Sequence, residues 1–384
     1  MREYQLPARF ETFPQEQKDA FLQVLARKER GELLAGTFCT FAPCEILDAA
    51  GIHSVRLCGR DEETILAAER HLPKNLCPLI KSSYGAAVSD ACPYTYFADL
   101  IVGETSCDGK KKMYELLSRF KNVYVLQLPQ GADRSYAQAM WTQELRRFRS
   151  VLEDTFHVVI SDEAIRAAAG LRNQLRQAQT ALMDLLKLDP PPLSGMELFG
   201  ILDRTRSCFD LNAGIEALKD QTARIRADYD AGKRPIPAGR KRILITGCPV
   251  GGVLEKTVQA VEENGGTVVC FETCEGVKAA RHLVDTQAED IFSAIARRDL
   301  NTGCAVMSPN RSRMELLPQL AAEFRVDGIL EVELPVCHPY TVERREMERL
   351  AEHLDLPFLA VSTDYSQADV GPLTTRIAAF LELL

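Results

Sequence analysis

The sequence lacks the segments that direct a protein into or across a membrane. Its N-terminus, MREYQLPARFETFPQEQ, has no apolar stretch like that of a secretory signal, and no uninterrupted apolar run reaches the roughly 18 residues of a membrane span. Basic surface is also scarce, because 46 Lys and Arg stand against 54 Asp and Glu, for a net charge of -8. We therefore expect a cytoplasmic protein that binds neither nucleic acid nor membranes.

Short metal-binding and nucleotide-binding motifs are missing as well. No pair of cysteines has the CxxC spacing of thioredoxin-like proteins or zinc ribbons, and the closely spaced cysteines of bacterial ferredoxins are absent. The nearest approach to a phosphate loop, Gly247 to Thr257, has its lysine a helical turn too late for a Walker A loop. This segment is a structural turn at the start of a helix, or an anion site at that helix N-terminus.

Strand-like apolar runs alternate with helical stretches in two parts of the chain. With 384 residues, the chain exceeds what one hydrophobic core usually serves. The alternation predicts an α/β protein with two parallel-sheet domains covered by helices. The first group of predicted strands is 54–57, 100–102 and 123–126, and the second is 242–246, 267–269, 328–332 and 358–361.

Between these two units the composition favours helices and shows few strand signals. The Gly- and Pro-rich segment 231–239 is followed at once by a strand, which is typical of a domain boundary. The sequence therefore predicts an N-terminal domain over residues 1–160, a helical connector over 161–238 and a C-terminal domain over 239–384.

Twelve cysteines in a chain without a secretory signal need an explanation. In a reducing compartment they serve as metal ligands, as catalytic groups or as small core residues rather than as disulfides. Burial is the ordinary explanation for any single cysteine. It is our prediction for the four cysteines that lie in plain apolar patterns, which are Cys58, Cys77, Cys208 and Cys270.

Other cysteines lie where a parallel sheet collects its ligands, just beyond the carboxyl ends of strands. Cys107, Cys248, Cys274 and Cys337 each follow a predicted strand, and Cys304 precedes an apolar run. Cys39 and Cys92 lie in turn-like segments that could present a thiolate. His338 and Tyr340, beside Cys337, are either candidate proton donors or polar residues satisfied by their neighbours.

Several of these segments resemble a known family. The run from Phe38 to Gly51, FCTFAPCEILDAAG, resembles the opening motif of the 2-hydroxyacyl-CoA dehydratase family. Six further blocks look specifically like the double-cubane cluster proteins of that family, and the likeness extends from about Gly31 to the C-terminus. The blocks are SDACPY, GETSCDGKKKMYE, TGCP, FETC, CAVMSPN and CHPYTVE.

The resemblance implies two Rossmann-like, flavodoxin-like domains and two four-iron cubanes joined by a sulfide. Such a double-cubane cluster is held by six cysteines, whereas ordinary dehydratase subunits use three for one four-iron cluster. Cys39, Cys92 and Cys337 match the dehydratase set, Cys107, Cys274 and Cys304 match the second cubane, and Cys248 is a reserve ligand. Cys44 departs from many relatives and has an open role.

The resemblance also implies an anaerobic redox enzyme that reduces small molecules at low potential. Its electrons come from a separate homodimeric ATPase with its own iron–sulfur cluster. A chain that carries all six ligands is expected to form a homodimer. Two alternatives stay open at this point, a subunit of a 2-hydroxyacyl-CoA dehydratase, which is a lyase, and an electron relay without a substrate of its own.

Overall fold

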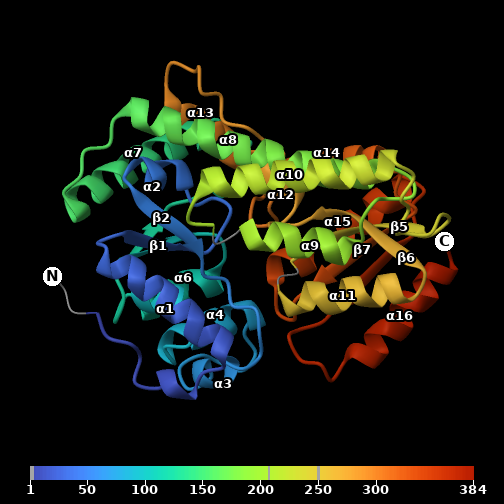
Figure 1. The fold of residues 1–384 in the computed structure, drawn as a ribbon, viewed down its shortest axis with the longest axis horizontal. Helices are drawn as coiled ribbons and strands as arrows, with labels where there is room; N and C mark the ends of the chain where they lie inside the picture. The colour runs from blue at the N-terminus through green and yellow to red at the C-terminus, as the bar shows by residue number, and fades with distance from the viewer. Residues whose placement is uncertain (1–3, 206–207, 249–250) are drawn as a thin grey trace.

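The computed structural model describes residues 4–205, 208–248 and 251–384 (Figure 1). Two four-stranded parallel sheets lie in separate lobes, the N-terminal one in blue and cyan and the C-terminal one in orange and red. Helices surround both sheets, which confirms the predicted α/β class. Pro249 and Val250, in the predicted turn between Gly247 and Thr257, lie outside the described residues.

The first sheet has the strand order β2-β1-β3-β4. Its central strand, β1, was not predicted, because its sequence LLAGT has only one β-branched residue, at its end. The strand is nevertheless buried on both faces between β2 and β3, where small residues fit. The strands are β1 (Leu33–Thr37), β2 (Ile52–Arg56), β3 (Leu100–Glu104) and β4 (Val123–Leu126).

The second sheet repeats this arrangement with the order β6-β5-β7-β8. All four of its strands coincide with predicted strands, because each contains a predominantly apolar run, as expected for a parallel sheet covered by helices. The strands are β5 (Lys241–Gly247), β6 (Gly266–Glu272), β7 (Gly328–Glu333) and β8 (Phe358–Ser362).

Helices fill the connections between strands and the segment between the two sheets. The first sheet is accompanied by η1 (Phe10–Thr12), α1 (Gln15–Glu29), α2 (Cys44–Ala49), α3 (Ile65–Ala68), α4 (Pro78–Val88), α5 (Pro93–Phe97) and α6 (Asp108–Leu117). The second is accompanied by α11 (Gly252–Glu263), α12 (Val277–Ala280), α13 (Ile291–Leu300), α14 (Arg311–Glu323), α15 (His338–His353) and α16 (Val370–Glu382).

In the described part of the middle of the chain lie four helices and a short 3-10 turn, and α8 and α10 run along one side of both lobes (Figure 1). Polar caps fix where they start. Ser161 accepts a hydrogen bond from Ala164 at the start of α8, and Ser194 with Glu197 forms a capping box at α9. The elements are α7 (Ala137–Phe156), α8 (Asp162–Asp184), η2 (Leu185–Lys187), α9 (Gly195–Arg204) and α10 (Leu211–Asp230).

The two lobes share parts of the chain. Helix α13 packs against α7, so that Ile291, Phe292 and Ile295 belong to the apolar core of the first sheet rather than to the second. Direct hydrogen bonds also join the lobes, including that from the Tyr365 hydroxyl to the Gly59 carbonyl, 2.9 Å long. The domain boundaries at 160 and 238 stay a prediction, because packing does not follow the chain order strictly.

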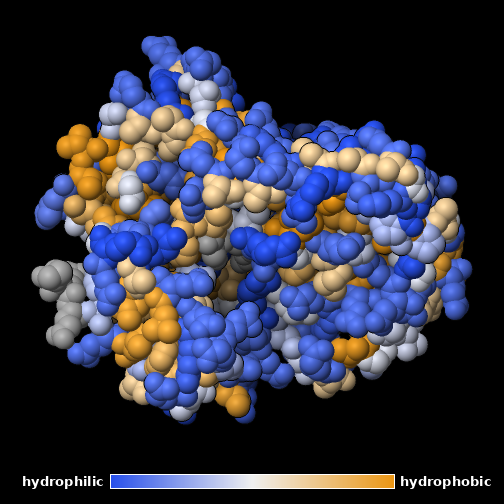
Figure 2. Space-filling model, in the orientation of Figure 1, coloured by the Kyte–Doolittle hydropathy of each residue, from blue (hydrophilic) through white to orange (hydrophobic). Residues whose placement is uncertain are grey.

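The visible face of the molecule is mostly hydrophilic, with scattered apolar patches (Figure 2). This agrees with helices that turn their apolar sides toward the sheets. None of the helices in the described part of the chain has the length and apolar character needed to cross a membrane.

Candidate functional site

The cysteines predicted as ligands lie at strand ends and helix starts. Cys107 and Cys337 are the residues just before α6 and α15, and Cys77 precedes α4 in the same way. Cys39, Cys248 and Cys274 lie just beyond β1, β5 and β6. Helix N-termini carry partial positive charge and free N–H groups, so these positions favour thiolates and other anions.

Two local backbone features set the positions of Cys248 and Cys337. Gly247 has a φ of 110°, and a Cβ there would come within 2.0 Å of the Val332 carbonyl oxygen, so only glycine fits before Cys248. Val336, a β-branched residue, has a φ of 60°, a conformation that L-residues of this kind avoid. Strained residues of this sort occur preferentially at functional sites.

Four thiols gather on one side, and we call Cys77, Cys107, Cys248 and Cys337 the first thiol group. Cys337 hydrogen-bonds to both Cys248 and Cys77, and these bonds raise the pKa of Cys337. The Cys77 thiolate is stabilised chiefly by its hydrogen bond with Cys337, which lowers the pKa of Cys77 to about 7. The charges of Cys77 and Cys248 also act on Cys107, whose pKa is raised mainly by burial.

Three further thiols, Cys39, Cys274 and Cys304, form the second thiol group. Burial raises the pKa of Cys39 well above its usual range, and the charges of Glu104, Cys304 and Cys274 add to this. Burial likewise raises the pKa of Cys304 to about 11, with Cys274 as the next cause. Cys248 acts on Cys304 too, so the two groups adjoin.

Buried hydroxyl groups without partners border the thiols. Among the described residues, the side chains of Thr40, Ser106 and Thr273 have no hydrogen-bond partner although they are buried. Each is the sequence neighbour of a thiol, Cys39, Cys107 or Cys274. Buried polar groups are normally hydrogen-bonded, so these hydroxyls are available as donors to a bound group. Hydroxyls next to thiolates suit a sulfide-containing cluster, whose sulfurs accept hydrogen bonds.

Two buried lysines supply positive charge on either side of the thiols. Lys110, on α6, is 9% exposed and donates to the Phe38 carbonyl oxygen at 3.1 Å, one residue before Cys39. Lys278, on α12, is 1% exposed, lies 2.9 Å from the Glu272 carboxylate and donates to the Tyr340 hydroxyl at 3.0 Å. Buried charges are retained only where a partner offsets the desolvation cost.

The two predicted proton donors differ in their surroundings. Tyr340 is buried, which raises the pKa of its hydroxyl, and the charges of Cys304, Cys274 and Cys248 raise it further. His338 is exposed at the first residue of α15. Tyr340 therefore faces both thiol groups with a protonated hydroxyl, whereas His338 lies at the surface.

The thiols do not form a site for a single metal ion. Within the described ranges, no group of three or more His, Cys, Asp or Glu side chains is arranged to hold one ion. An iron–sulfur cluster has a different requirement, because each thiolate would bind its own iron. The two thiol groups, the unpaired hydroxyls and the buried cations supply the ligands, the hydrogen-bond donors and the positive charge that such a cluster would need.

Comparison with known proteins identifies the family of this chain. Residues 39–384 match the protein family described as "2-hydroxyglutaryl-CoA dehydratase, D-component". This chain belongs to that family.

Relatives that align over most of the chain support the assignment. YjiM of Escherichia coli (strain K12), provisionally assigned as a dehydratase component, is 46% identical over 380 residues, which cover 99% of this chain and 98% of the relative. The beta subunit of (R)-phenyllactyl-CoA dehydratase from Clostridium sporogenes is 21% identical, covering 93% of both chains. A component of the benzoyl-CoA reductase of Thauera aromatica is 18% identical, covering 89% of this chain and 88% of the relative.

Family membership confirms the resemblance to the 2-hydroxyacyl-CoA dehydratase family and places the chain among relatives of dehydratase and reductase subunits. The chain therefore belongs to a family of enzymes, and these two relatives are named as subunits.

In this D-component chain, the structure groups the predicted ligands differently from the resemblance. Cys107 lies with Cys337 in the first thiol group, whereas Cys39 lies with Cys274 and Cys304 in the second. Cys92 is the residue just before α5, and its charge acts on the Lys121 ammonium group. It is not among the main influences on the pKa of any thiol in the two groups, so its role as a ligand stays a prediction.

Cys77 is the residue that sequence reasoning missed. It is 7% exposed and part of the apolar core, as predicted, yet its thiol also contacts Cys337. A signal was present: Cys77 is followed by Pro78 at a helix start, the same Cys-Pro pattern as Cys92 and Cys248. Proline is favoured in the first helical turn, so Cys-Pro marks a thiol at a helix N-terminus.

The other predicted core cysteines have mixed outcomes. Cys270 is fully buried in the core, as predicted. Cys58 packs against the core but is only partly buried, and its thiol donates to the Phe38 carbonyl oxygen at 3.2 Å. Cys208 lines a pocket and donates to the Asp210 carbonyl oxygen at 2.9 Å, so its predicted core position was wrong. Cys44, with its open role, lines the same pocket.

Proposed function

We propose that this chain holds a double-cubane iron–sulfur cluster between its two thiol groups and uses it to reduce small molecules at low potential. Seven thiols from both lobes, gathered among buried cations and unpaired hydroxyls, are the observation that supports the proposal. When bound, such a cluster supplies low-potential electrons. The chain contributes the ligands, the dry surroundings and the charges that set the potential.

Six of the thiols are the proposed ligands. Cys77 takes the place predicted for Cys92, because it contacts Cys337 while Cys92 lies near Lys121. Cys248 is kept as the reserve ligand, as the resemblance implies. It also contacts Cys337 and acts on Cys304, so it lies at the junction of the two groups. The proposed set is Cys39, Cys77, Cys107, Cys274, Cys304 and Cys337.

Protein groups near the thiols hold charge and protons. Lys110 and Lys278 offset the negative charge of the thiolates from opposite lobes. Tyr340 keeps a proton on its hydroxyl oxygen, which accepts a hydrogen bond from Lys278 and faces Cys304, Cys274 and Cys248. We propose Tyr340 as the proton donor to a bound substrate, with exposed His338 as a route for protons from solvent.

Electrons are proposed to come from a separate homodimeric ATPase with its own iron–sulfur cluster. The chain itself is proposed to be a homodimer, because one copy contains the whole ligand set and needs no second cysteine-bearing subunit.

A second function is favoured by the names of the relatives. The relative from (R)-phenyllactyl-CoA dehydratase is a lyase component, so a role as one subunit of an acyl-CoA dehydratase is the alternative. Iron and sulfide analysis of protein purified without oxygen separates the two. About eight irons per chain support the double cubane, and about four support a dehydratase subunit.

Activity provides the second part of this test. With the reduced ATPase partner and ATP, we expect turnover of acetylene, azide or hydrazine. Full iron content without turnover of any of them would leave an electron relay and contradict the reductase.

A further inference from the structure

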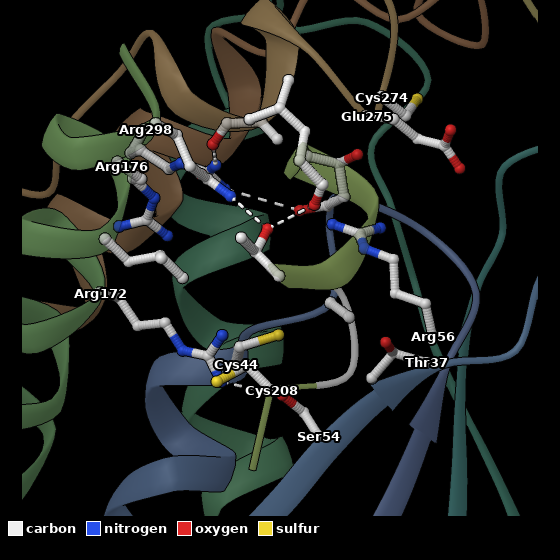
Figure 3. Close-up of a pocket in the computed structure, with 17 residues that line it drawn as sticks. Thr37, Cys44, Ser54, Arg56, Arg172, Arg176, Cys208, Cys274, Glu275 and Arg298 are labelled. Atoms are coloured by element: carbon white, nitrogen blue, oxygen red, sulfur yellow. Dashed lines mark hydrogen bonds between the residues drawn. The ribbon is translucent and has the colours of Figure 1, made fainter. Parts of the chain in front are cut away.

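A pocket rich in arginine adjoins the second thiol group, and nothing in the proposed function accounts for it. It lies beyond the carboxyl ends of β1 and β2, against α8 and the loop after β6, and holds about 850 Å³ of space not filled by atoms, part of it open solvent (Figure 3). Cys274 forms part of its wall. We call it the arginine pocket, after Arg56, Arg172, Arg176 and Arg298.

Three of the four guanidinium groups have carboxylate partners. Arg172 forms a two-pronged pair with Asp48, at 2.5 and 2.8 Å, and Arg176 pairs with Glu45. Both pairs join α8 to α2, so they have a structural role. Arg298 lies 3.0 Å from Asp299.

Arg56 is different, because its side chain makes no hydrogen bond or ion pair with any described residue. Its charge acts at longer range on Glu104, at the end of β3. Figure 3 shows its guanidinium reaching into the pocket from β2, on the side opposite Arg172. Glu275 also lines the pocket and has a partner of its own. Among the described residues of this wall, Arg56 is therefore the guanidinium that is available to pair with a ligand.

One buried donor on the pocket wall also lacks a partner among the described residues. Arg298 is 6% exposed, and its Nε has no acceptor, although its other nitrogens bind Asp299 and the Ala279 carbonyl. A buried donor without an acceptor is costly, which indicates a ligand that brings acceptors.

A carboxylate fits these requirements. It accepts hydrogen bonds at two oxygens and pairs with guanidinium in a fixed, planar geometry. One unpartnered guanidinium fork matches one carboxylate, so a ligand with a single carboxylate suffices. Apolar side chains complete the wall and suit a short hydrocarbon body. They are Ala42, Leu175, Leu202 and Ala279.

We infer that the arginine pocket binds a small organic monocarboxylate, with Arg56 as its charge partner, and holds it beside Cys274. The substrate role of this ligand rests on the proposed function, whereas its binding does not. A free acid recognised through its carboxylate is a different class of ligand from an acyl-CoA thioester.

The test compares propionate with propionamide, which has nearly the same shape and no charge. Binding to the anaerobically purified protein is measured by calorimetry and by the fluorescence of Trp141. Trp141 is the single tryptophan of the chain, and its Nε1 donates to Asp299, the partner of Arg298, at 3.0 Å. We expect propionate to bind and propionamide to bind at least about tenfold more weakly.

Arg56→Gln should weaken propionate binding about tenfold to hundredfold, the usual range for a lost hydrogen bond to a charged group, and leave propionamide unchanged. Arg56→Lys keeps the charge without the planar fork and should bind propionate with intermediate affinity. Arg70→Gln, at an exposed site outside the pocket, is the matched control and should behave like the wild type. Thermal unfolding should be unchanged in all three, because Arg56 holds no ion pair with a described residue.

Equal binding of propionate and propionamide, or wild-type affinity in Arg56→Gln, would overturn the inference. Calorimetry does not depend on iron content. A failure of carboxylate binding is therefore distinct from a failure of the cluster assignment, which iron analysis reports.

Discussion

Replacing Lys110 by methionine should lower the reduction potential of the bound cluster. The ammonium is buried on α6, and its hydrogen-bond acceptor is the Phe38 carbonyl oxygen beside Cys39. If the separation were on the order of 7 Å, the attraction of an added electron to this cation would be about 2.4 kcal/mol at an effective dielectric constant of about 20. That corresponds to about 100 mV for a one-electron couple.

Glu104 moderates this shift. Burial raises the pKa of Glu104 to about 7, although Lys110 pulls it down. Without Lys110 the pKa of Glu104 rises further, so this carboxylate takes up protons and offsets part of the lost positive charge. The expected decrease in potential is therefore on the order of 50 to 100 mV.

The assay is a redox titration of the anaerobic protein followed by electron paramagnetic resonance. Lys111→Met is the matched control, because Lys111 is the next residue on the same helix, 45% exposed, and paired with Asp108. Its potential should equal that of the wild type within error. An unchanged or higher potential in Lys110→Met, with iron content intact, would refute the proposed role of this cation.

Measured as iron per chain, Cys77→Ser should lose iron and Cys92→Ser should keep it, because the Cys77 thiol contacts Cys337 whereas Cys92 lies near Lys121. The opposite result would restore the ligand set expected from the resemblance. Glu45→Gln should lower the free energy of unfolding by about 3 kcal/mol at pH 7, since it strands the buried Arg176. Burial opposes ionisation of Glu45, but Arg176 lowers the pKa of its carboxyl group to about 2. The pair therefore contributes stability that is present above pH 4.5 and is lost as the pH falls toward 2. Denaturant unfolding between pH 3 and 7 that shows no such loss would contradict a stabilising role of this pair. Light scattering on anaerobic protein should give a homodimer, and isolation only with a second cysteine-bearing subunit would favour the dehydratase alternative.

The sequence predicted the second sheet better than the first for a physical reason. Strands β5 to β8 each carry a predominantly apolar run, which indicates a parallel sheet without further information. β1 carries Ala and Gly at its centre instead. Its place in the sheet depends on β2 and β3, which pair with it on both sides, and this tertiary packing is invisible in a short window.

The candidate site shows the same division between local and distant information. Position after a strand correctly indicated where Cys107, Cys274 and Cys337 lie, because the carboxyl ends of parallel strands form one edge. Which thiols share a group could not be predicted, since it depends on how the two lobes meet. Cys77 belongs to the first lobe and Cys337 to the second, and their contact depends on that meeting.

The arginine pocket was not predicted at all. Its residues are spread from β1 to α13, and each arginine alone has the pattern of a surface charge on a helix or strand. Only the structure separates Arg56, without an ion-pair partner among the described residues, from Arg172 and Arg176, which are already paired.

The central claim is that the two thiol groups hold one double-cubane cluster. An anaerobic crystal structure with anomalous scattering from iron tests it most directly, because it counts the irons and identifies their ligands together. The account predicts about eight irons between the lobes, bound by Cys39, Cys77, Cys107, Cys274, Cys304 and Cys337. About four irons bound by three cysteines, or iron bound by Cys92 and not by Cys77, would contradict it.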